Sequence, residues 1–198
     1  MSIFTSNTNS KKGIPKRFSK IARLGSDLFS ISDLASLWEV RDPHVLRVTL
    51  KRYADKGLLF RIHRGLYAIK PAKQIDPFVL GQKVLRRFSY ISTETILAEA
   101  GIVMQQTDVV TLVSPVSRKF SVASRRFVSG QLADRFLFNE YGVIDKDGIK
   151  KATEERAVAD MLYFNPRAHF DADRSIDWKK VRDIQAHVGY PLTPKRYH

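Results

Sequence analysis

One basic helix face carries the residue types that could do chemistry in this sequence. Asp42-Pro43 predicts its start, because an aspartate side chain accepts backbone N–H groups and proline already has a helical φ; Gly57 predicts its end. At 3.6 residues per turn the segment has one apolar stripe and an opposite polar face. The stripe holds Leu46, Leu50 and Tyr53, with Pro43 and Ala54 beside it. The polar face holds His44, Arg47, Val48, Lys51 and Arg52.

Such a face is typical of a helix that reads DNA. An α-helix fits the major groove of B-DNA, where Arg or Lys bonds guanine O6 and N7 and an apolar group touches a thymine methyl. Val48 is either a base-reading contact or an ordinary exposed apolar residue. The whole face is either a recognition surface or the solvated side of a core helix.

The flanking segments favour recognition. Ser32 is expected to N-cap a short helix over residues 33–38, which a turn at residues 39–41 separates from the basic helix. Residues 58–63 and 66–69 have the composition of hairpin arms, with Arg64-Gly65 as their turn. Together these elements predict a winged helix-turn-helix whose wing grips phosphate without reading sequence. The expected wing contacts are Arg61, His63 and Arg64.

An amphipathic helix is expected upstream, over residues 14–23. Its inward residues are Ile14, Phe18, Ile21 and Ala22, and its outward residues are Lys16, Arg17, Lys20 and Arg23. We expect Lys16, Arg17 and Lys20 to join the DNA-binding surface. Charge supports this assignment, because residues 1–73 carry 15 basic and 5 acidic side chains whereas residues 74–198 carry 19 and 15. The expected partner is therefore a polyanion, and duplex DNA is preferred to a membrane.

The gross composition excludes several other classes. The 198-residue chain has no cysteine, which rules out disulfides and thiolate metal sites, and its five histidines lack metal-ligand spacing. No segment approaches the roughly 18 apolar residues of a membrane span. We expect a cytoplasmic protein that needs no metal or cofactor, with residues 1–13 as a disordered basic arm.

The chain is expected to be α+β, with a winged helix-turn-helix over residues 14–70, a linker over 71–76 and a smaller α+β domain over 77–198. Asp76-Pro77 predicts a helix to about Phe88, and Ser92 should cap a short helix closed by Gly101. Strands are expected at residues 108–113, 127–129 and 136–138. Thr153 should cap a helix through Phe164, and Asp177 should start the last helix.

These motifs, in this order, resemble the AbiEi family, the antitoxins of AbiE-type (type IV) toxin-antitoxin systems. The likeness runs from about Ile14 to Phe164, and Glu154 departs from it, since the family often has proline there. The carrying segments are Arg64-Gly65-Leu66-Tyr67, Asp76-Pro77, Tyr90-Ile91-Ser92, Ala100-Gly101-Ile102 and Ala152-Thr153-Glu154-Glu155-Arg156-Ala157 with Asp160.

The resemblance implies an antitoxin that represses its own operon by binding inverted repeats and neutralises a nucleotidyltransferase-like toxin. It gives the reading role to His44, Arg47, Val48, Lys51 and Arg52, and the wing role to Arg61 and Arg64. Basic pairs in the second domain either extend the DNA footprint, meet an acidic partner or are simply solvated. They are Arg86, Arg87, Arg118, Lys119, Arg125 and Arg126.

Catalysis is not expected. Arg156 and Asp160 have helical i, i+4 spacing, which predicts a structural ion pair worth a few tenths of a kcal/mol. Asp33 has no second acid near it for a magnesium site, and no Ser/His/Asp set or phosphate-binding glycine loop is present. Three hypotheses remain: an autoregulating antitoxin, a stand-alone winged-helix regulator with a sensor or assembly domain, and a nucleic-acid enzyme with an unrecognised site.

Overall fold

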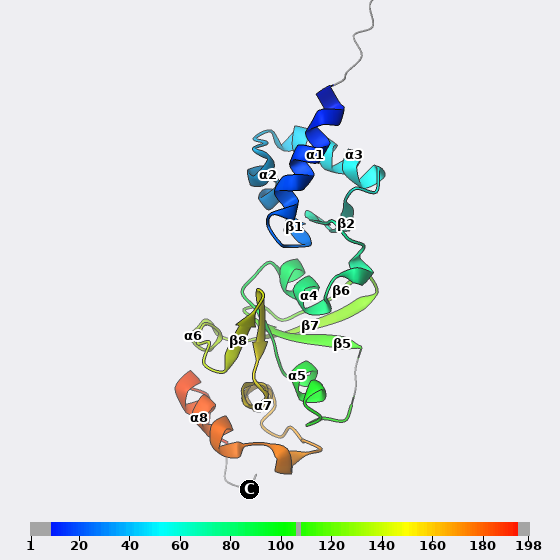
Figure 1. The fold of residues 1–198 in the computed structure, drawn as a ribbon. Helices are drawn as coiled ribbons and strands as arrows, with labels where there is room; N and C mark the ends of the chain where they lie inside the picture. The colour runs from blue at the N-terminus through cyan, green and yellow to red at the C-terminus, as the bar shows by residue number, and fades with distance from the viewer. Residues whose placement is uncertain (1–8, 106–107, 194–198) are drawn as a thin grey trace, which may run out of the picture. The chain divides into compact units, whose positions relative to one another are not determined.

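The computed structural model describes residues 9–105 and 108–193. The chain divides into two compact units, Met1–Ile75 and Asp76–His198, which are coloured blue to teal and green to red in Figure 1. Residues Ala72–Gln74, expected within a linker, form a 3₁₀ turn. The architecture is α+β, as expected from the sequence.

Over residues 9–75, the described part of the N-terminal unit, the chain forms three α-helices and a small antiparallel sheet. The helices are α1 (Asn9–Ala22), α2 (Ile31–Trp38) and α3 (Pro43–Asp55), and the strands are β1 (Leu28–Ser30), β2 (Phe60–His63) and β3 (Leu66–Ala68). The strand order is β1-β3-β2, so β1 adds a third strand to the expected hairpin. At the open end of β1, Ile69 N donates to Asp27 O at 3.2 Å and Lys70 Nζ lies 2.9 Å from Asp27 Oδ2.

The core of this unit lies between the three helices and the sheet. Leu46, Leu50 and Tyr53 are buried on α3, as the stripe predicted, and they meet Leu34 and Trp38 of α2. The Tyr53 and Trp38 rings are edge-on, with centroids 5.7 Å apart. This packing fixes which side of α3 turns outward.

Several sequence expectations for this unit were wrong. Ser30, not Ser32, caps α2: its Oγ accepts from Asp33 N at 3.1 Å, and its N–H donates to Asp33 Oδ2 at 2.8 Å. Ala22 is exposed rather than inward, because it lies at the last position of α1. Residues 9–13, expected in a disordered arm, are helical because they extend α1 by about one turn. Residues 1–8 lie outside the described part.

The C-terminal unit is built on a mixed six-stranded sheet of order β6-β7-β5-β4-β9-β8. Its strands are β4 (Tyr90–Ile91), β5 (Val109–Ser114), β6 (Arg118–Val122), β7 (Arg125–Gln131), β8 (Val143–Lys146) and β9 (Ile149–Ala152). Its helices are α4 (Pro77–Leu85), α5 (Glu94–Glu99), α6 (Asp134–Leu137), α7 (Glu154–Phe164) and α8 (Trp178–Val188), with a 3₁₀ turn at Asp173–Ser175.

Two glycine contacts show that α4 and α7 cover opposite faces of this sheet. A Cβ added to Gly81 of α4 would lie 2.8 Å from the Phe127 ring, so the absent side chain lets α4 lie close to β7. A Cβ added to Gly130 would lie 3.0 Å from the Phe164 ring of α7. Phe127 and Gly130 are three residues apart on β7 and therefore face opposite sides.

Local structure differs from expectation at four points in this unit. Helix α4 ends at Leu85 because Arg86 takes a left-handed conformation (φ 55°). Ser92 does not cap α5; the N-cap is Thr93, and Ser92 Oγ donates to Asp160 instead. Residues 136–138, expected as a strand, belong to the α6 turn, whose Phe136 N–H donates to Ala133 O. Strands β6, β8 and β9 were not expected, since their charged residues mask the alternation of strand composition.

The Arg156–Asp160 pair forms as predicted, but it is far more buried than a surface i, i+4 pair. Both side chains are fully buried, and Arg156 Nε donates to Asp160 Oδ1 at 2.9 Å. Arg156 also donates to the Tyr90 hydroxyl and to the Tyr141 carbonyl, each at 2.8 Å, while Tyr190 donates to Asp160 at 2.7 Å. Breaking such a pair costs about 3–5 kcal/mol, not the few tenths expected from spacing alone.

Candidate nucleic-acid interface

The candidate recognition helix is α3, and its start is fixed locally. Asp42 Oδ1 accepts from His44 N at 2.7 Å and from Val45 N at 3.4 Å, with Pro43 at the first helical position. Beyond the other end, Gly57 takes a positive φ of 67°. The helix therefore begins at Pro43, directly after Asp42, and ends before Gly57, as the sequence predicted.

The face of α3 opposite the core is fully solvent-facing. All five expected reading residues are exposed: His44, Arg47, Val48, Lys51 and Arg52. The side chain of Val48 is 53% exposed at the middle of this face. Two neighbours refine the face: Thr49 is buried with the core stripe, and Val45, 48% exposed, lies at the margin. Amphipathic spacing left both residues unassigned, because each falls between the two faces.

The wing is the β2–β3 hairpin. Along β2, Arg61 and His63 are exposed and alternate with half-buried Phe60 and Ile62. Arg64 is exposed at the turn, where Gly65 has a φ of 68°. Gly65 O accepts from Ile31 N at 3.0 Å, which ties the turn to the start of α2. The hairpin thus presents three cationic or titratable side chains on a turn held by the helical part of the unit.

Helix α1 supplies fewer available cations than the sequence suggested. Lys16 is exposed, but Arg17 Nη1 donates to the Tyr53 hydroxyl at 3.2 Å, and its guanidinium lies 5.4 Å from the centre of the Trp38 ring. Lys20 Nζ donates to Glu39 Oε1 at 2.6 Å and to Leu37 O at 3.1 Å. That hydrogen bond with Lys20 lowers the pKa of Glu39. Arg17 and Lys20 therefore already serve to hold α1 against α2 and α3, and their DNA contacts stay a prediction.

Arg41 is a further candidate that the sequence analysis left out. It is exposed in the turn between α2 and α3, directly before the Asp42 cap. In helix-turn-helix proteins the N-terminal residues of the recognition helix approach the base edges. Its position one residue before the cap was the signal that could have identified it.

The basic pairs of the C-terminal unit do not form a single surface. Arg118 and Lys119 are neighbours on β6 and so face opposite sides of the sheet. Arg87 and Arg126 are exposed, whereas Arg125 is half-buried. In the part of the chain that the structure describes, no three His, Asp or Glu side chains are grouped to hold a metal ion, and no helix has the length and apolar character of a membrane span.

Comparison with known proteins finds a family match in the N-terminal unit. Residues 18–70 match a family model described as "Transcriptional regulator, AbiEi antitoxin", which confirms the resemblance for this segment. A search of curated proteins found no match. A crystal structure of the RV2827C protein from Mycobacterium tuberculosis is similar in fold, with a TM-score of 0.52 and 15% identity over 87% of this chain and 70% of that one.

Proposed function

We propose that this chain, whose residues 18–70 match the AbiEi antitoxin family of transcriptional regulators, is an antitoxin that binds DNA through α3 and its wing and represses its own operon. The observation that carries the proposal is the exposed α3 face, with Val48 among Arg47, Lys51 and His44. Arg and Lys suit guanine and phosphate, and the valine suits a thymine methyl.

Two further features support the division of roles. Arg61 and Arg64 lie on a short hairpin next to α3 in sequence, where they suit phosphate, which fixes orientation without reading bases. The net positive charge of residues 1–73 favours a polyanion. We expect the operator to contain inverted repeats.

The C-terminal unit is proposed to neutralise a toxin that resembles a nucleotidyltransferase. This part rests on the family match and on the resemblance of the C-terminal segments, because the exposed residues of this unit do not identify a toxin-binding surface. The protein is proposed to act by binding rather than by catalysis and to work in the cytoplasm.

The test combines DNA binding with toxicity. A gel shift of the purified chain on the DNA upstream of its own gene, in rising salt, should show a specific complex whose affinity falls steeply with salt. If a neighbouring gene encodes a nucleotidyltransferase-like toxin, co-expression of this chain should restore the growth of cells that express that toxin. Specific DNA binding without any relief of toxicity would instead favour a stand-alone regulator. The absence of both specific DNA binding and relief of toxicity would reject the proposal.

A further inference from the structure

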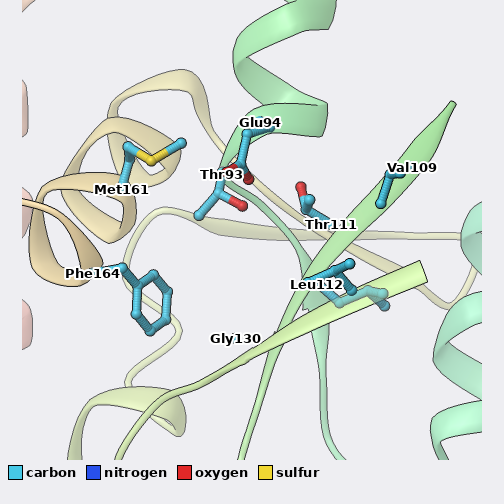
Figure 2. A pocket seen from close by; sticks show the side chains of 9 residues that line it. Thr93, Glu94, Val109, Thr111, Leu112, Gly130, Met161 and Phe164 are labelled. Atoms are coloured by element: carbon cyan, nitrogen blue, oxygen red, sulfur yellow. The ribbon is translucent and has the colours of Figure 1, made fainter. Parts of the chain in front are cut away.

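A pocket of about 330 Å³ opens on the sheet face of the C-terminal unit that α5 and α7 flank. Figure 2 shows Thr93 and Glu94 at the start of α5, Met161 and Phe164 on α7, and Val109 on β5. Its volume lies at the lower end of the range for small-molecule sites, roughly 300–1,000 Å³. Nothing in the proposed DNA-binding or neutralising roles uses it.

The floor of the pocket is apolar. In the parallel β5–β7 register Thr111 is the partner of Val128, and both line the pocket. The Thr111 hydroxyl is already engaged, since it donates to Ser92 O at 2.6 Å. At Gly130 the Phe164 ring lies close to the strand, since a Cβ added there would be 3.0 Å from the ring. A flat ring can therefore lie on Val128 with Phe164 beside it.

One end of the pocket is polar. Thr93 is only 6% exposed and has φ 52° and ψ −131°, a conformation that favours glycine and is strained for a β-branched residue. Among the residues that the structure describes, neither the Thr93 hydroxyl nor the exposed Glu94 carboxylate has a hydrogen-bond partner. The strained backbone therefore places two acceptors at one end of an apolar slot.

The strands beyond the floor carry cations on the same face. Arg126 is the register partner of Val109, and Lys119 is directly opposite Val128 on β6. Register partners on neighbouring strands share a face, and in an antiparallel pair such as Lys119 and Val128 their Cβ atoms are about 4.5–5.5 Å apart. Both cations are exposed, and each is the register partner of a residue that lines the pocket, so basic side chains lie next to the pocket on its sheet face.

We propose that this pocket binds a small heteroaromatic anion, specifically a nucleoside monophosphate unit. The ring lies on Val128 beside Phe164, its N–H groups donate to the Thr93 hydroxyl and Glu94 carboxylate, and Lys119 and Arg126 hold the phosphate. A free mononucleotide and the phosphorylated end of a nucleic acid share this chemistry. The inference does not depend on operator binding by α3.

The test is isothermal titration of the full chain with AMP, GMP, CMP and UMP, with a 5′-phosphorylated trinucleotide, and with adenosine and inorganic phosphate as partial ligands. We expect at least one mononucleotide or the trinucleotide to bind, and both partial ligands to bind more weakly. Mononucleotide binding identifies a free nucleotide as the source, and binding of the trinucleotide alone identifies a nucleic-acid end. Absence of binding by all of them overturns the proposal.

Matched variants locate the binding. Lys119→Gln should weaken the affinity roughly tenfold, the effect of losing one charge-assisted hydrogen bond. Arg118→Gln removes the same charge from the opposite face of β6 and should leave the affinity unchanged. Equal losses in both variants would mean general charge attraction and would overturn the site. Arg47→Ala should not alter nucleotide binding, which separates this test from that of the recognition helix.

A second pair of variants tests the polar end. Thr93→Val removes the hydroxyl with little change of shape and should weaken binding, while Thr93→Ser should retain it. Glu94→Gln should change the preference among the four bases, because an amide donates as well as accepts. If Thr93→Val binds as well as the parent chain and Glu94→Gln keeps its base preference, the ring does not lie at this end.

Discussion

Arg17 Nη1 donates a 3.2 Å hydrogen bond to the hydroxyl of Tyr53 and thereby links α1 to the buried side of α3. The same guanidinium lies over the Trp38 ring, so one side chain contacts both helices of the helix-turn-helix. A residue that sequence placed on the DNA-facing side thus positions the recognition helix from behind. Its replacement should affect the stability of the unit as well as any binding.

The first prediction separates base reading from phosphate contact. Arg47→Ala should weaken operator binding and relax sequence preference, with a cost of about 1–3 kcal/mol, because Arg47 lies on the exposed face of α3 that we propose enters the major groove. Arg64→Ala should weaken operator and random duplexes about equally. Arg167→Ala, at an exposed position of the C-terminal unit, is the charge-matched control. Fluorescence anisotropy measures the affinity of each variant for the operator and for a random duplex. If Arg47→Ala, like Arg64→Ala, loses affinity equally for the two duplexes, Arg47 does not read bases in the groove.

The second prediction concerns Val48. If it touches a thymine methyl, Val48→Ser should reduce operator affinity roughly fivefold or more without changing the slope of affinity against salt, since no charge is lost. Val45→Ser is the control, because Val45 is 48% exposed, much like Val48 at 53%, but lies about 60° round the helix at the margin of the face. Similar losses in the two variants would assign Val48 to solvent rather than to DNA.

The third prediction tests the cap of α2. Ser30→Ala should lower the free energy of unfolding by about 1 kcal/mol, because it removes the Ser30 Oγ that accepts from Asp33 N, although the backbone bond from Ser30 N to Asp33 remains. Ser32→Ala should have a smaller effect, since the Ser32 hydroxyl bonds the Ser30 hydroxyl, at 2.7 Å, rather than a backbone N–H of α2 among the described residues. Urea unfolding measures the free energy of unfolding of the two variants. A larger loss in Ser32→Ala than in Ser30→Ala would mean that Ser32 caps α2.

The fourth prediction concerns the buried pair on α7. Asp160→Asn leaves the fully buried Arg156 without its counterion and should cost about 3–5 kcal/mol of unfolding free energy. Asp183→Asn, which affects an exposed partner of His187 and Tyr141, should cost less than about 1 kcal/mol. If Asp160→Asn does not fold, Ser92→Ala removes one hydrogen bond to the same carboxylate and should lower stability by roughly 1 kcal/mol. An unchanged urea midpoint in Ser92→Ala would contradict the importance of the network.

The fifth prediction is a loss of stability at alkaline pH. Burial, together with the Asp160 carboxylate, raises the pKa of Tyr90 and of Tyr190. The neutral hydroxyls therefore stabilise the fold fully below about pH 10, the pKa of an unfolded tyrosine, and this contribution is lost as the pH rises toward the folded values. Thermal midpoints between pH 8 and 11 should fall less steeply in Tyr190→Phe than in the parent chain.

The raised pKa values of Lys150 and Lys180, caused by hydrogen bonds to Glu140 and Glu155, change stability in the same direction and in an overlapping pH range. Their effect is common to both proteins, so the difference between the two pH profiles isolates the tyrosine. Parallel profiles would mean that Tyr190 ionises without unfolding.

Features encoded by neighbouring residues were predictable. Asp42-Pro43, the apolar stripe of α3 and the Thr153 cap each depend on residues within about one turn, and the structure confirms them. The Ser30 cap was also readable, because Ser30 and Asp33 have capping-box spacing with Asp in the acidic position. Ser30 and Ser32 were both candidates for the N-cap of α2, and only Ser30 has the capping-box spacing to Asp33.

Features made by distant residues were not predictable. Strand β1 has only three residues and exists because Leu28–Ser30 pairs with Leu66–Ala68. The burial of Arg156 depends on Tyr90 and Tyr190, which lie far away along the chain. Likewise, the engagement of Arg17 by Tyr53 is invisible to helical periodicity, which sees only the spacing within α1. In each case the tertiary partner, not the local pattern, decides the role.

The bonds at Asp27 bring the two ends of the segment from residue 27 to 70 side by side: Ile69 N to Asp27 O at 3.2 Å and Lys70 Nζ to Asp27 Oδ2 at 2.9 Å. Segments whose ends meet at the surface tolerate circular permutation and transplantation into host loops. Residues 27–70, which contain the helix-turn-helix and the wing, therefore form a segment whose two ends are adjacent. New chain ends or an insertion point placed there would leave α3 and the hairpin uncut, but α1 has to be kept with the segment because Ile21 and Arg17 of α1 contact its core.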